Sequence, residues 1–324
     1  MPKARNDFLD RLTYVALRVV SAGFHTWPVD ANLNTAKFIG GLWFRVGRKH
    51  RLRAMGNLRR SFPEKSENEI ARLARQSMQH LVMFAVEMLF TTRLIRIDTW
   101  RKYCVAGRSN FAPVLKLMLR EQTHTPPGST DAGKGRGLIM LTAHYGNWEI
   151  LGYIMATLGF ESTAVARPLD NPYLNEWVMG VRERQGHRII DKKGATTEVT
   201  DILSRGGVVG FIADQNAGKK GMFVDFFGRK ASTYKSIGLL AMEFQVPVVI
   251  GCAKRVGDRF KYEMVLQEII TPDQWQDQPD PLRYITQRYT KAIEDMVRDD
   301  PGQYLWVHRR WKTRPKGEEP ERFD

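Results

Sequence analysis

The feature that most constrains the fold is residues 137–158, where an apolar run passes directly into an amphipathic one. Residues 137–143 are nearly all apolar, which is typical of a strand buried on both faces of a sheet. Residues 148–158 repeat apolar side chains at helical spacing. His144 therefore lies where a buried strand passes into a helix, and open α/β sheets carry out their chemistry at that edge.

The rest of the chain continues the alternation of strand and helix. Ser66 and Glu69 form a capping box that opens a long amphipathic helix. We predict strands at 162–166, 188–190, 208–213, 222–226, 246–254 and 260–267, and helices at 172–184, 196–204, 232–244 and after Asp280. This rhythm predicts an α/β fold, a mixed central sheet covered by helices, with an N-terminal amphipathic helical segment. The expected parts are a membrane-associating helical segment at 1–97, a catalytic domain at 98–315 and a polar tail at 316–324.

His144 and Glu149 are the first candidate catalytic residues. They lie five positions apart across the turn, so a carboxylate in the first helical turn can hold the imidazole in one tautomer. An imidazole oriented in this way is a general base. The same spacing also suits a histidine that only caps the helix or packs beneath the loop.

Several sequence boxes occur together with this pair. They are His144-x-Gly146-Asn147-Trp148-Glu149, Asn57-Leu58 with Phe62-Pro63-Glu64, Ala166-Arg167-Pro168, Ala213-Asp214-Gln215, Phe226-Phe227-Gly228 and the run His308 to Pro315. In their order along the chain they resemble the lysophospholipid acyltransferase superfamily, within it the branch of late lipid A acyltransferases. The chain departs from that pattern at its less apolar first helix and at residues 122–136, which look like an inserted loop.

The resemblance implies transfer of a fatty acyl chain from acyl carrier protein or coenzyme A to a hydroxyl of a lipid or glycolipid, with no cofactor and no metal. His144 would be the base and Glu149 its orienting partner. The acceptor would be a lipid A precursor, with a mannosylated phospholipid or an aminolipid as alternatives. The chemistry needs no acyl-enzyme, because the acceptor hydroxyl takes the place of a catalytic serine.

Further residues are candidates for binding substrate. Tyr145, Gly146 and Asn147 follow His144, and the backbone N–H groups at Gly146 and Asn147 would receive the oxyanion. Arg167, at a predicted strand end, could hold a phosphate bidentately, unless it is an ordinary surface arginine.

Two more boxes carry candidate substrate-binding residues. Asp214 and Gln215 would line the acceptor pocket or support the histidine loop, unless they only cap a strand end. Phe227 and Gly228 would line an acyl groove, although a Phe pair is often plain core.

Charge and hydropathy indicate an anionic partner. Lys plus Arg number 50 against 35 Asp plus Glu, a net charge of +15, which favours polyanions such as an anionic membrane surface. Residues 8–24 present an apolar face interrupted by charges, so they could lie in a membrane interface or pack as an ordinary surface helix. With the basic cluster at 45–53, this predicts monotopic or peripheral binding to an anionic membrane surface. The family resemblance implies that this surface is the cytoplasmic face of the inner membrane.

Two other function classes share some of these features. A nucleic-acid binder would use the charge and the aromatic and basic residues at 306–314, but no recognised binding motif is present and nucleic acid is not expected. A metal-dependent hydrolase would add His187 or His308 to His144, but metal-ligand spacing is lacking. Cys104 and Cys252 also lack such spacing, as expected in a reducing compartment.

Overall fold

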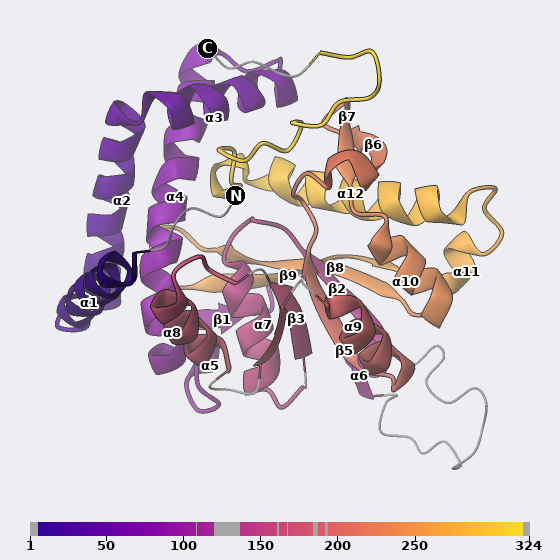
Figure 1. Ribbon diagram of the computed structural model, residues 1–324, viewed down its shortest axis with the longest axis horizontal. Helices are drawn as coiled ribbons and strands as arrows, with labels where there is room; N and C mark the ends of the chain where they lie inside the picture. The colour runs from indigo at the N-terminus through magenta and orange to yellow at the C-terminus, as the bar shows by residue number, and fades with distance from the viewer. Residues whose placement is uncertain are drawn as a thin grey trace.

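The computed structural model describes residues 6–107, 109–119, 137–160, 162–166, 168–183, 187–191 and 194–319 (Figure 1). The predicted insertion at 122–136 and Arg167 lie outside the described residues. The insertion and the role of Arg167 therefore remain predictions.

Four helices open the chain: α1 (Asp7–Phe24), α2 (Val29–Val46), α3 (Arg48–Ser61) and α4 (Glu67–Leu94). The capping box of Ser66 and Glu69 is present at the start of α4, as predicted. α2 and α4 pack along each other at one end of the sheet (Figure 1). In the part of the chain that the structure describes, none of the helices combines the length and the apolar character that a bilayer crossing requires.

Among the described residues, a seven-stranded mixed sheet forms the centre of the protein. Its strands are β1 (Cys104–Val105), β2 (Leu138–Thr142), β3 (Ser162–Ala166), β4 (His187–Asp191), β5 (Val208–Ile212), β8 (Val248–Arg255) and β9 (Tyr262–Ile270), in the order β1-β9-β8-β2-β5-β3-β4. All neighbours are parallel except β8 and β9. The predicted α/β class and mixed sheet are confirmed.

Helices cover both faces of this sheet (Figure 1). Alternate residues of β2 separate the two sides: Ile139 and Leu141 pack with α10 (Ser236–Phe244) and α12 (Pro281–Asp299), and Leu138 packs with α6 (Ala112–Leu119). The other helices in the described ranges are α5 (Trp100–Tyr103), α7 (Trp148–Thr157), α8 (Pro172–Glu183), α9 (Ala195–Ser204), α11 (Pro272–Trp275), η2 (Gly218–Lys220) and η3 (Pro301–Gln303).

The predicted helix at 232–244 begins later than expected. Residues Arg229–Thr233 form strand β7, which pairs antiparallel with β6 (Met222–Phe226), and the helix starts only at Ser236. Phe227 and Gly228 form the two-residue turn between the strands, with φ of 54° and 68°. Two positive φ angles give this turn the twist that a tight hairpin needs.

The N-terminal helices and the C-terminal segment are joined by buried hydrogen bonds. The Asn57 amide on α3 donates to the carbonyls of Trp306 and His308, at 2.8 and 3.1 Å. Trp306, Arg310 and Trp311 are buried, so much of the aromatic and basic segment at 306–314 packs into the protein. The Arg310 guanidinium donates to Ser232 and Thr233 of β7.

Candidate active site

His144 and Asp214 come together at the carboxyl edge of the sheet. β2 and β5 are adjacent and parallel, with Thr142 opposite Ile212, and each side chain lies two residues beyond that pair. The His144 Nδ1 and Asp214 Oδ1 atoms are 2.8 Å apart. The Asp214 side chain is fully buried and the His144 side chain is 15% exposed, so the imidazole alone reaches outward.

The environment of Asp214 favours a carboxylate. Burial alone would raise its pKa, but the attraction of His144 and the hydrogen bond from its ring outweigh burial and hold the pKa well below the usual range. An ionised Asp214 can only accept, so Nδ1 of His144 carries the hydrogen. Nε2 of the neutral ring is then the basic atom, on the side away from Asp214.

Gln215 and His308 lie at this basic side. The Gln215 amide nitrogen is 3.3 Å from Nε2 of His144 and 3.4 Å from Nε2 of His308. The two imidazole rings are 4.7 Å apart. Burial and the neighbouring His144 lower the pKa of His308 to about 4, so His308 is neutral at pH 7. The sequence predicts His308 only as part of a box and as a hypothetical metal ligand, because no local pattern indicates that residue 308 returns to residue 144.

Glu149 occupies a different place from the one expected. The carboxylate bonded to Nδ1 belongs to Asp214, whereas Glu149 lines a cavity beneath α7. The difference arises because β5 ends beside β2, which places Asp214 at the ring. The expectation that Asp214 supports the histidine loop agrees with this geometry.

The cavity beneath α7 has a volume of about 90 Å³ and is lined almost entirely by apolar side chains of α7, β2, β3 and β5. Among the described residues that line it, Glu149 is the only charged one. Trp148 connects the cavity to the histidine, since its ring lies 4.9 Å from that of His144 and stacks on Phe84 at 3.8 Å. The site therefore joins a basic imidazole nitrogen to an apolar space.

The turn after His144 is held by the protein itself. The N–H of Gly146 donates to the Gln303 carbonyl at 3.2 Å, and that of Asn147 donates to the Ala253 carbonyl at 2.8 Å. Both groups are thus engaged, and the expected oxyanion site at these two amides is not formed in this structure. Gly146 has a φ of 58°, and a Cβ atom there would lie 2.2 Å from the Ala253 carbonyl oxygen, so only glycine fits.

Tyr145 and Asn147 are buried rather than open to substrate. Tyr145 is 1% exposed and pairs with Tyr304 in an isolated antiparallel bridge. The Asn147 side chain caps α7 by accepting from the Ile150 N–H at 3.1 Å. Their positions indicate support for the turn.

Phe227 and Gly228 lie at the hairpin turn between β6 and β7. The Phe227 ring is 4% exposed and packs edge to face against Phe62 and Trp306. Its N–H donates to the Glu294 carboxylate at 2.5 Å. This packing is that of a core aromatic residue.

The described ranges contain no group of three His, Cys, Asp or Glu side chains that could hold a metal ion. His308 lies beside His144 and Asp214 without forming such a group. The side chain of His187 is outside the described part.

Sequence comparison assigns the family. A family profile described as bacterial lipid A biosynthesis acyltransferase matches residues 6–313. The chain is 27% identical over 269 residues to the lipid A biosynthesis palmitoleoyltransferase of Escherichia coli strain K12, covering 82% of this chain and 79% of that protein. It is 25% identical over 265 residues to the lauroyltransferase of the same strain, covering 81% and 78%. It is also 24% identical over 282 residues to a lipid A biosynthesis acyltransferase of Haemophilus influenzae, covering 86% and 81%. The protein with this histidine–aspartate pair therefore belongs to the bacterial lipid A biosynthesis acyltransferase family, and it is an acyltransferase.

Proposed function

We propose that this protein transfers a fatty acyl chain from an acyl thioester to a hydroxyl of a lipid A precursor. The thioester is carried by acyl carrier protein or by coenzyme A. The observation that carries the proposal is the His144–Asp214 pair at 2.8 Å, joined through Trp148 to an apolar cavity. A base beside an apolar space suits an attacking hydroxyl and an acyl chain.

His144 acts as the general base. Its Nε2 takes the proton of the acceptor hydroxyl while the oxygen attacks the thioester carbonyl, and the ionised Asp214 stabilises the imidazolium that forms. When the tetrahedral intermediate collapses, the C–S bond breaks and the proton leaves with the thiolate as a thiol. General base catalysis of this kind contributes roughly 10² to 10⁴ in rate. The acceptor hydroxyl replaces the 3.3 Å contact of Gln215 with Nε2, and Gln215 and His308 then line the acceptor side.

Glu149 faces the acyl side of the reaction. It lines the apolar cavity, where a carboxylate in the first turn of α7 lies next to the bound thioester. The cavity of about 90 Å³ receives the start of the acyl chain, and the remainder of the chain extends beyond it. Arg167 is the proposed partner of an acceptor phosphate, since its predicted strand ends at the same edge of the sheet.

The arrangement of α1 supports binding to a membrane surface. Its polar side faces the protein: Arg11 donates to the Tyr173 hydroxyl of α8 at 2.8 Å, and the Arg18 guanidinium lies 5.6 Å from the Trp177 ring. Its apolar side faces outward, with Phe8 and Val19 72% and 67% exposed. A surface helix of a globular protein turns its apolar face to the core and its polar face to solvent. We therefore place the outward apolar face of α1 against lipid.

The basic cluster at 45–53 contributes less charge to that surface than the sequence suggested. Arg45, Arg48 and Lys49 are exposed. Arg51 and Arg53 are half-buried and donate to the carbonyls of Phe44 and Val307. Three exposed cations favour peripheral binding to an anionic surface. We assign that surface to the cytoplasmic face of the inner membrane, because the proposed thioester donors are cytoplasmic.

The test is acyl transfer by the purified protein. Acyl carrier protein and coenzyme A thioesters are offered with a lipid A precursor, a mannosylated phospholipid or an aminolipid in anionic vesicles, and the products are weighed by mass spectrometry. We expect the lipid A precursor to gain the mass of one acyl chain, and His144→Ala to abolish this gain while remaining folded. Product formation by His144→Ala within a few-fold of the parent rate would refute the role of His144. Acylation of only another lipid would refute the proposed acceptor.

A further inference from the structure

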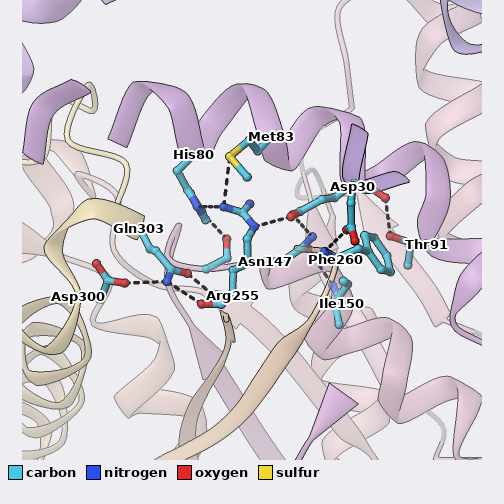
Figure 2. A network of polar contacts seen from close by, with 12 residues as sticks. Asp30, His80, Met83, Thr91, Asn147, Ile150, Arg255, Phe260, Asp300 and Gln303 are labelled. Atoms are coloured by element: carbon cyan, nitrogen blue, oxygen red, sulfur yellow. Dashed lines mark hydrogen bonds and ion pairs between the residues drawn. The ribbon is translucent and has the colours of Figure 1, made fainter. Parts of the chain in front are cut away.

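A buried polar network lies directly behind the catalytic turn (Figure 2). Arg255, the last residue of β8, donates from Nε to the Glu87 carboxylate of α4 at 2.5 Å. The Arg255 side chain is 4% exposed and the Glu87 side chain is fully buried. The second oxygen of Glu87 accepts from the side-chain amide of Asn147 at 2.8 Å. The ion pair is thus bonded to the turn at Asn147, three residues after His144.

His80 precedes Glu87 on the same helix, α4. It holds the turn at a second point. Nη1 of Arg255 is 2.7 Å from Nδ1 of His80, and Nε2 of His80 is 2.9 Å from the Gly146 carbonyl oxygen. A guanidinium can only donate, so Nδ1 of His80 accepts and Nε2 carries the hydrogen. His80 therefore donates to Gly146. Burial and the charge of Arg255 lower the pKa of His80, which keeps the ring neutral.

Gln303 completes the set from the C-terminal side. Its backbone carbonyl accepts from the Gly146 N–H. Its side-chain oxygen accepts from the Arg255 N–H at 2.9 Å. Its side-chain nitrogen donates to the Arg255 carbonyl at 3.0 Å and to the Asp300 carboxylate at 2.8 Å (Figure 2). The backbone at Gly146 is consequently held from both sides.

This network is poorly explained by stability alone. Burying a charged pair costs solvation that its mutual attraction only partly returns, and a well-packed apolar pair is often as stable or more so. Here each member of the pair also makes a hydrogen bond that supports the turn. Glu87 accepts from Asn147 of the turn, and Arg255 donates to His80, which binds the turn. Because Asp214 fixes only the ring of His144, the position of that ring relative to substrate depends on the backbone that the network holds.

We propose that His80, Glu87 and Arg255 are positioning residues that hold the 144–147 turn in the geometry required for transfer. The proposal rests on the proposed function, since it presumes His144 as the base. None of the three side chains reaches the reacting atoms. Their effect is on the placement of Nε2 of His144, and a misplacement of about 1 Å is enough to lower a rate about a hundredfold.

Two variants at one position separate positioning from stability. In His80→Gln the side-chain amide can still donate to the Gly146 carbonyl, but the acceptor for Arg255 is lost. In His80→Asn the shorter side chain can still accept from Arg255, but the donor to Gly146 is lost. Each variant removes one buried hydrogen bond, so a purely structural role predicts equal effects on both.

We expect His80→Gln to keep kcat within about threefold of the parent, and His80→Asn to lose about ten- to a hundredfold in kcat with KM for the thioester unchanged. Thermal unfolding of the two variants should be similar. Equal kcat values in the two variants, or kcat values that follow the unfolding temperatures, would overturn the proposal. His144→Ala measured alongside tells the two proposals apart: if it remains active, the proposed function fails, whereas an inactive His144→Ala with a fully active His80→Asn overturns only the positioning role.

Arg255→Lys decides the matter if the His80 variants do not fold. Lysine keeps a positive charge for Glu87 but lacks the forked donors that fix the His80 tautomer. We expect kcat to fall at least tenfold with KM within twofold. Arg288→Lys is the matched control, because Arg288 makes a forked ion pair with Glu268 of β9 that does not touch the turn. Full kcat in folded Arg255→Lys, or an equal loss in Arg288→Lys, would contradict the positioning role.

Discussion

Asp214→Asn tests the electrostatic core of the proposed mechanism. When His144 accepts the proton of the acceptor hydroxyl, its ring becomes positive with Nδ1 2.8 Å from the Asp214 oxygen. The centres of the two charges are then about 4 Å apart, and at an effective dielectric constant of about 20 their attraction amounts to about 4 kcal/mol. The effective value suits this site because Asp214 is fully buried while His144 retains 15% exposure. Asparagine keeps the shape and loses this attraction.

Each 1.36 kcal/mol corresponds to a tenfold change in rate, so kcat should fall about a thousandfold. KM for the acceptor should change little, because the attraction acts on a charge that develops only in the transition state. The assay is steady-state acyl transfer with mass-resolved product. Asp225→Asn is the control, since Asp225 forms an exposed ion pair with Lys230 at 3.0 Å, and it should leave kcat unchanged. If folded Asp214→Asn keeps kcat within tenfold of the parent, the reasoning is refuted.

Three further predictions concern affinity, location and pH. Arg167→Lys should raise the acceptor KM with kcat little changed, because lysine keeps the charge without the fork; an unaltered KM counts against the phosphate role. Replacing both Phe8 and Val19 by Glu should reduce sedimentation with anionic liposomes. Leu239→Glu, at another exposed apolar site on α10, should not. Equal sedimentation of the parent and both variants would place the lipid contact elsewhere. The pKa of His308 is lowered from 6.5 to about 4. The imidazole therefore binds a proton more readily in the unfolded chain, and the free energy of unfolding falls as the pH drops from about 6.5 to about 4. Between pH 7 and pH 5 the contribution is about 2 kcal/mol; urea unfolding of His308→Leu should show a smaller loss over this range than the parent, and an equal loss would contradict the assignment.

Much of the fold could be predicted because it depends on local periodicity. The strand at 162–166 has the predicted bounds, and the helix after Asp280 begins where its cap was expected. The error at 232–244 has a local cause too: Arg229–Thr233 extends as a strand because the turn at Phe227 and Gly228 folds it back on β6. Helical spacing continues across that boundary in the sequence, so the pattern alone did not show where the helix starts.

The candidate site divides differently between sequence and tertiary structure. The position of His144 at a strand end follows from the apolar run before it, and the need for glycine at 146 follows from the close approach of the Ala253 carbonyl, which only the folded chain reveals. The N–H groups of Gly146 and Asn147, predicted as oxyanion donors, instead donate to the carbonyls of Gln303 and Ala253. Both carbonyls lie over a hundred residues away in the chain, so no local pattern indicated these bonds.

What the sequence by itself determined is the strand–turn–helix unit that presents His144, the alternation that builds the sheet, and membership in the acyltransferase family, because each rests on residue types at short or fixed spacings. Tertiary structure alone decided which carboxylate binds the imidazole. β5 follows β2 by two intervening strands along the chain yet lies next to it in the sheet, and that order depends on pairings between distant segments. Asp214 is therefore brought to Nδ1 of His144, His308 to the opposite side of the ring, and the Glu87–Arg255 pair to the back of the turn, by contacts that no local pattern encodes.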